Sequence, residues 1–203
     1  MGIIGIGLFL AGSIIGGLLI ENYTASQQLI SETYAIDTKH GLVLRSIGII
    51  PSGILLTLFV LGAHQIFPQS KQTKMGFYGL GLFYGIATIL VGIFPCDSGC
   101  NKALIDPSVA QLIHIVSGVL TYIFVPICIS LIGLGLKRIN GYNKFASLSI
   151  LAGFGSMLLV FLFFSMQKDE YIGVYQRMVE GVFATWIIYC SYVIKNHTHE
   201  KHI

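Results

Sequence analysis

The amino-acid sequence predicts an all-α integral membrane protein, a six-helix bundle with both termini in the cytoplasm. Composition is the first indication, because 54% of the 203 residues are hydrophobic and only 10% are charged. A soluble domain carries about 25% charged residues. The mean hydropathy of +0.79 agrees. The spacing of the apolar residues and the placement of the basic residues support the same fold class.

Six apolar segments can be read along the chain, each near the roughly 20 residues that cross a bilayer as a helix. They cover residues 2–20, 46–66, 75–94, 109–136, 146–164 and 172–194. The loops between them leave no room for a soluble domain, so we expect one six-span transmembrane domain over residues 1–203. The fourth helix is expected to begin at Asp106-Pro107, since Asp is a good N-cap and Pro is tolerated in the first turn.

Basic residues indicate the orientation, because they are enriched in cytoplasmic loops. One side of the predicted bundle carries seven: Lys71, Lys74, Lys137, Arg138, Lys144, Lys195 and Lys201. The other side carries four, Lys39, Arg45, Lys102 and Lys168, diluted by acidic residues. We therefore expect a multi-pass protein of the cell membrane whose partner is the lipid bilayer. No basic soluble surface is predicted, so nucleic-acid binding is not expected; the sequence leaves the oligomeric state open.

Ionisable side chains gather in the outer half of the predicted bundle. Asp97 ends the third helix, and His114 lies about 12 Å down the fourth at 1.5 Å per residue. Glu32 approaches from the first outer loop. The sixth helix adds three residues that can share one face: Gln176, Arg177 and Glu180. Charged groups at this depth face the bundle interior and are usually functional. We expect them to converge, either as a structural network or as an outward-facing pocket.

In the pocket interpretation, His114 acts as an acid–base catalyst, with Asp97 and Glu32 orienting it or holding a divalent cation. Arg177 binds an anionic group of a small polar or lipid-headgroup ligand, with Gln176 and Glu180 beside it. The sequence leaves open whether such a ligand is only bound or also processed, and whether a metal takes part. The alternatives are a proton-coupled transporter that uses His114, Asp97 and Glu180 as a relay, and a non-catalytic envelope scaffold or sensor.

Cys96 and Cys100 lie in an outward-facing loop, where oxidising conditions favour a disulfide. Gly99 gives the backbone latitude to close so small a ring. A free or metal-binding thiol pair is the alternative. Cys128 and Cys190 lie within apolar helices and are interpreted as small apolar residues.

Several short motifs resemble one known family. Residues 92–97, Gly-Ile-Phe-Pro-Cys-Asp, followed by His114, are similar to the core signature of the prokaryotic family called domain of unknown function 998. Further resemblance lies in the first loop (Tyr23, Ser31-Glu32) and in the last helix (Gly173, Gln176-Arg177, Trp186). The sequence departs from the pattern at Thr33-Tyr34, where Leu-Gly is expected. The resemblance implies a six-helix membrane protein without a known reaction, and it adds Ser31 and Tyr23 to the candidate ligand-binding residues.

Overall fold

The computed structural model describes residues 1–167 and 170–200, without the side chains of 197–200. Lys168 and Lys201, used above for the orientation, lie outside these residues. The described chain is helical and contains no strand. Five helices are long and apolar enough to cross a membrane: Gly41–Ile66, Lys71–Ile93, Val109–Leu136, Asn143–Ser165 and Ile172–Asn196. A shorter apolar helix, α1 (Gly2–Leu18), precedes them and packs on the first and the last of them. The multi-pass helical architecture is thus confirmed.

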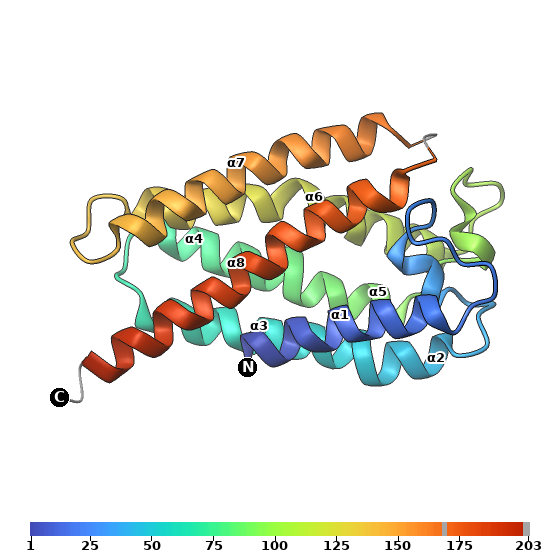
Figure 1. Cartoon of the computed structure of the whole chain (residues 1–203), viewed down its shortest axis with the longest axis horizontal. Coiled ribbons are helices and arrows are strands. Elements are labelled where there is room, and N and C mark those ends of the chain that lie inside the picture. The colour runs from blue at the N-terminus through green and yellow to red at the C-terminus, as the bar shows by residue number, and fades with distance from the viewer. Residues whose placement is uncertain (168–169, 201–203) are drawn as a thin grey trace.

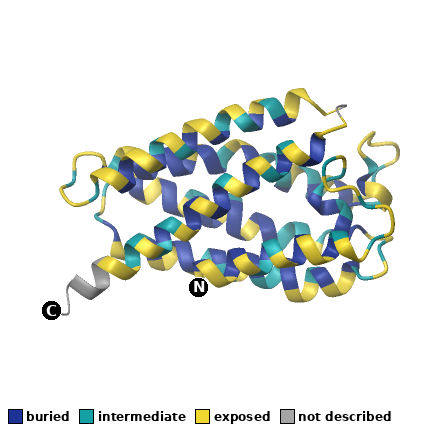
Figure 2. Cartoon of the chain, in the orientation of Figure 1, coloured by how far each residue is buried: buried dark blue, intermediate teal, exposed yellow. Residues whose placement is uncertain are grey.

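The helices lie side by side along the long axis of the molecule (Figure 1). The loops after α1, after α5 (Ala87–Ile93) and after α7 (Asn143–Ser165) gather at one end. The N-terminal residue lies near the middle of the long axis, and the described C-terminal part of the last helix lies toward the opposite end. The outward faces of the helices are largely exposed, as Figure 2 shows by colour. Many of the exposed residues are large and apolar, among them Ile14, Leu58, Leu151 and Phe161, and this pattern is typical of contact with lipid.

Two of the long helices are interrupted by π-helical turns. The first consists of α2 (Gly41–Leu44), the π-helical η2 (Arg45–Ile49) and α3 (Ile50–Ile66). The second consists of α4 (Lys71–Leu80), the π-helical η3 (Gly81–Ile86) and α5. Such turns are rare and occur often at functional sites. Pro51 directly follows η2 inside the first of these continuous helices, and its ring removes one backbone hydrogen-bond donor there.

The start of α6 (Val109–Leu136) corrects one expectation. Ser108, not Asp106, is the N-cap, and its hydroxyl accepts a 3.1 Å hydrogen bond from the Gln111 amide nitrogen. Asp106 has a φ of +45° and lies in the preceding loop. A serine hydroxyl satisfies the same orphaned amides that an aspartate would.

The half of the bundle away from the loops after α1, α5 and α7 is packed mainly with apolar and aromatic side chains. Phe67 stacks between Phe77 and Phe145, at ring distances of 5.3 and 5.2 Å. The buried indole of Trp186 donates a 2.9 Å hydrogen bond to Ser149, which joins α8 (Ile172–Glu200) to α7.

Candidate functional site

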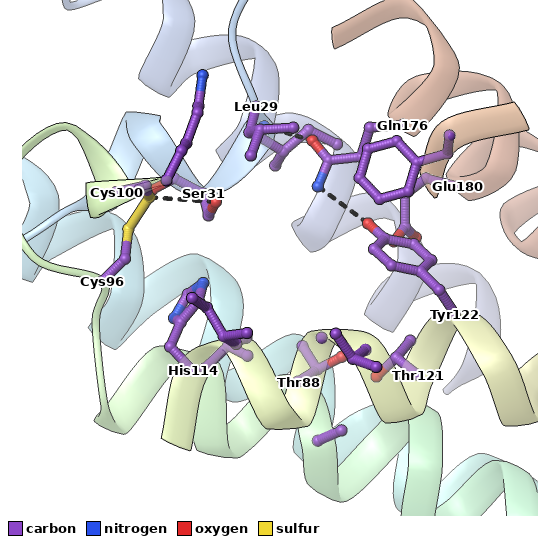
Figure 3. Close-up of a pocket in the computed structure, with 18 of the residues that line it drawn as sticks. Leu29, Ser31, Thr88, Cys96, Cys100, His114, Thr121, Tyr122, Gln176 and Glu180 are labelled. Carbon is purple, nitrogen blue, oxygen red and sulfur yellow. Dashed lines mark hydrogen bonds between the residues drawn. A yellow bond between two sulfur atoms is a disulfide. The ribbon is translucent and has the colours of Figure 1, made fainter. Parts of the chain in front are cut away.

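A cavity of about 380 Å³ lies in the half of the bundle that carries the loops after α1 and α5. Its walls come from α1, η3, α5, α6, α7 and α8, and its roof from the 3₁₀ turn η1 (Ile30–Tyr34) and the loop after α5. Figure 3 shows the disulfide, Ser31 and His114 on one side and Gln176, Tyr122 and Glu180 on the other. Thr88 and Thr121 lie along the floor of this view. Much of the remaining wall is apolar: Phe9, Val91, Ile115, Val119, Phe163 and Phe164. The cavity therefore offers polar groups inside an apolar shell, as ligand sites do.

A chain of hydrogen bonds links the roof to the far wall. The Ile30 amide donates to Gln176 Oε1 at 2.7 Å, and Gln176 Nε2 donates to the Tyr122 hydroxyl oxygen at 2.9 Å. Since Tyr122 accepts from Gln176, its own proton is free to point to Glu180, which lies within hydrogen-bonding reach. The Tyr84 hydroxyl also donates to Glu180, at 3.2 Å. Gln176 and Glu180 thus both line the cavity, as predicted from their spacing on one helix face.

Glu180 is the buried carboxylate of the cavity, with 6% of its surface exposed. Its partners are the hydroxyls of Tyr84 and Tyr122. Within the described chain, no lysine, arginine or histidine forms an ion pair with it. Burying a carboxylate without a countercharge costs free energy, so its position on the cavity wall is not explained by stability alone.

His114 lies on the cavity wall and is 8% exposed. Its Nδ1 is 3.0 Å from the carbonyl oxygen of Phe94. A carbonyl can only accept, so Nδ1 carries the proton, and in the neutral ring Nε2 is left as an acceptor. Backbone, rather than a carboxylate, therefore orients this histidine.

Asp97 does not join His114. Its carboxylate is exposed and accepts from the Ser108 hydroxyl at 2.5 Å and from the Ser108 amide at 3.0 Å. These bonds, with the hydroxyl first, hold the pKa of Asp97 below its ordinary value. Asp97 thus fastens the loop to the start of α6 and does not reach the cavity.

Glu32 and Arg177 also have partners other than His114 or a ligand, which were the roles predicted for them. Glu32 caps η1 by accepting from the Leu29 amide at 2.8 Å, and it forms an ion pair with Lys102 at 2.6 Å. Arg177 donates to the Tyr23 hydroxyl at 2.6 Å and to the Gln28 carbonyl at 2.8 Å. Neither Arg177 nor Tyr23 is among the residues of the cavity wall.

The Tyr23 ring packs against the Arg177 guanidinium, 5.8 Å from the ring centre. Partial burial raises the pKa of Tyr23, and the positive charge of Arg177 offsets part of this effect. The two residues therefore hold the loop after α1 on α8.

The candidate metal ligands Asp97, His114 and Glu32 are not brought together. Among the described residues, no group of three or more His, Cys, Asp or Glu side chains is arranged to hold a metal ion. The physical reason is that both carboxylates already have other partners: Glu32 caps η1, and Asp97 fastens the loop to the start of α6. The predicted convergence of five ionisable groups is thus reduced to two, His114 and Glu180.

Cys96 and Cys100 form a disulfide, as the sequence predicted. Both are buried in the cavity wall, and Ser31 Oγ lies 3.3 Å from Cys100 Sγ. Ser31 itself is 9% exposed and belongs to the wall. Cys128 and Cys190 are free and buried.

Gln111 was missed by the sequence reasoning. It is fully buried, accepts from the Asp97 amide at 2.6 Å and donates to the Cys100 carbonyl at 2.9 Å. Its side chain therefore holds both ends of the disulfide loop. A polar residue three positions before His114 in an apolar helix shares its face, and that spacing was the available signal.

Fold and site together define a multi-pass helical membrane protein with a buried, partly polar cavity toward one end. The family model described as "Protein of unknown function (DUF998)" matches residues 3–192, and the chain belongs to this family. This confirms the resemblance carried by the short motifs. No curated protein and no solved structure matches the chain.

Proposed function

We propose that the cavity binds a small amphipathic ligand, either a polar molecule or a lipid headgroup, and that it opens toward the outer face of the membrane. The protein crosses the membrane six times in this proposal, with α1 as the first span and both termini in the cytoplasm. The supporting observation is the cavity of about 380 Å³ with buried Glu180, His114, Gln176 and Ser31 on its wall. A bundle that needs only stability is served better by apolar side chains at these depths.

Side-chain roles follow from the geometry. Glu180, Gln176 and Ser31 contact the ligand's polar part, and His114 offers Nε2 as an acceptor or general base. Asp97, Glu32, Arg177 and Tyr23 act as supports, because they hold the outer loops that roof the cavity. The transporter alternative gains no support, since the helices beyond the cavity pack through apolar side chains.

The test uses a glycine that faces open space. A Cβ built on Gly118 meets nothing within 4 Å, and Gly118 lies on the cavity wall. Gly118→Leu should therefore fill the cavity without disturbing the fold. Gly155→Leu is the matched control, because its Cβ also meets nothing within 4 Å and it points away from the cavity on the exposed side of α7.

Native mass spectrometry of the detergent-purified protein measures the bound molecules retained from the membrane. We expect one retained adduct in the wild type and in Gly155→Leu, and its loss in Gly118→Leu. His114→Ala should remain folded and retain less adduct. Equal adducts in Gly118→Leu and Gly155→Leu, or a His114→Ala variant that only loses thermal stability, would contradict the proposal.

A further inference from the structure

We infer that the far wall of the cavity is a binding site for a cationic ammonium group, so that the ligand is an amine-bearing amphiphile. This inference rests on the proposed function and names the chemical class of its ligand. It is carried by the position of Glu180 among aromatic rings at the cavity surface.

Charge balance is the first argument. Glu180 brings a carboxylate to the cavity wall, and the described chain supplies no cation to pair with it. Lys102, at the cavity mouth, is already neutralised by Glu32 at 2.6 Å. Arg177 is held by Tyr23 and Gln28 away from the wall. The cavity thus favours a positive ligand over an anion, which reverses the expectation drawn from Arg177 in the sequence.

Hydrogen bonding is the second argument. An ionised carboxylate offers about four lone-pair positions. Tyr84 and Tyr122 occupy positions on Glu180, and both are neutral donors. The tyrosines therefore fix the carboxylate without cancelling its charge. The unoccupied positions suit the three N–H donors of a primary ammonium group.

The aromatic surroundings are the third argument. The Tyr84 ring meets Phe183 edge-on at 5.6 Å, and the Tyr122 ring meets Phe163 edge-on at 5.2 Å. Tyr84, Tyr122 and Phe163 all line the cavity. Aromatic faces attract ammonium ions, and cages of such rings recognise them. A carboxylate held by two tyrosines beside phenylalanine is thus suited to an amine.

The apolar part of the cavity wall indicates the chemistry of the remainder of the ligand. Ile115, Val119 and Phe164 line the same cavity, and Phe164 is 37% exposed. An alkyl chain attached to the ammonium group can bury its surface against these side chains.

Three six-carbon probes distinguish the outcomes: hexylammonium, hexanol and hexanoate, each added to the purified protein at pH 7 while the unfolding temperature is recorded. We expect saturable stabilisation by hexylammonium, at least tenfold tighter than by hexanol, with hexanoate weakest. Glu180→Gln keeps the side-chain shape and should reduce the preference for hexylammonium over hexanol to less than twofold. Glu21→Gln, an exposed carboxylate of the outer loop, should keep the full preference.

Equal binding of hexanol and hexylammonium by the wild type would overturn the inference, and so would an unchanged preference in Glu180→Gln. The wild-type comparison decides even if Glu180→Gln does not fold. If the wild type binds hexanol and hexylammonium equally but Gly118→Leu does not bind hexanol, the wild-type cavity binds ligands. The proposed function then stands although the inference of an ammonium site fails. If no probe binds and no adduct is retained, the proposed function fails as well.

Discussion

Arg177 Nη2 donates a 2.6 Å hydrogen bond to the hydroxyl of Tyr23, across 154 residues of sequence. The same guanidinium donates to the carbonyl of Gln28, and Tyr23 donates to the carbonyl of Leu29 at 3.0 Å. This contact joins α8 to the loop that leads into η1, the roof of the cavity. Arg177 thus acts on the site through the loop it holds.

Arg177→Gln should therefore loosen the loop. Loss of the charge-assisted bonds is expected to cost about 1–3 kcal/mol of stability. Hydrogen exchange of the amides in residues 23–30 should accelerate, and Tyr23→Phe should show a smaller change in the same direction. Arg138→Gln, an exposed arginine at the other end of the bundle, is the control. Loss of the retained adduct without faster exchange would instead place Arg177 in contact with the ligand.

The Asp97–Ser108 pair predicts a dependence of stability on acid. The pKa of Asp97 is lowered in the folded protein, so the carboxylate stabilises the fold above its ordinary pKa. This contribution is lost as the pH falls through the lowered value. Asp97→Asn should therefore melt below the wild type at pH 7, and the two melting curves should converge in strong acid.

Ser108→Ala provides a companion measurement, because it removes the N-cap of α6 at a cost of about 1 kcal/mol. Both variants should retain the adduct. Complete loss of binding in Asp97→Asn with an unchanged melting temperature would assign Asp97 to the ligand.

The disulfide can be tested by counting the free thiols before and after reduction. Denatured protein should take up two equivalents of iodoacetamide before reduction, at Cys128 and Cys190, and four after reduction. The replacement of Cys96 and Cys100 by Ser should cost about 2 kcal/mol, because the bridge closes a short loop. Ser31 should then become more accessible, since it rests on Cys100. Four reactive thiols before reduction would refute the pairing.

The orientation can be tested by labelling introduced cysteines in intact cells. Ile105, in the loop before α6, is 78% exposed, and Asn140, in the loop after α6, is also exposed. We expect Ile105→Cys to react with a membrane-impermeant maleimide and Asn140→Cys to react only after permeabilisation. The opposite pattern would invert the protein and place the cavity toward the cytoplasm.

The sequence predicted the helices well, because apolar runs of membrane length are strong signals. The expected 109–136 coincides with Val109–Leu136, and the expected 146–164 lies within Asn143–Ser165. The predicted helix ends that depend on polar capping residues were less accurate, since Ser108 rather than Asp106 caps α6. Amino-acid spacing does not reveal which of several neighbouring polar residues takes the cap.

The candidate site was predicted only in part. Gln176, Glu180, His114 and Ser31 do share a cavity, but Asp97, Glu32, Arg177 and Tyr23 lie in its supports. Helical periodicity tells which face a residue occupies, but it does not tell which loop atom will reach it. Tyr84 and Tyr122 escaped notice because tyrosines are ordinary in apolar helices, and only the fold brings them to Glu180.

The π-helical turn η3 determines how the helix Lys71–Ile93 tolerates changes in its length. Gly76, before the turn, packs closely against Ile132 of α6, while Thr88, after it, lines the cavity. Each residue of an α-helix turns the chain by about 100°. The deletion of one residue between Gly81 and Ile86 would therefore rotate Thr88 off the cavity wall while Gly76 stayed in place. The length of this six-residue segment, more than its composition, lets Gly76 face α6 and Thr88 face the cavity at the same time.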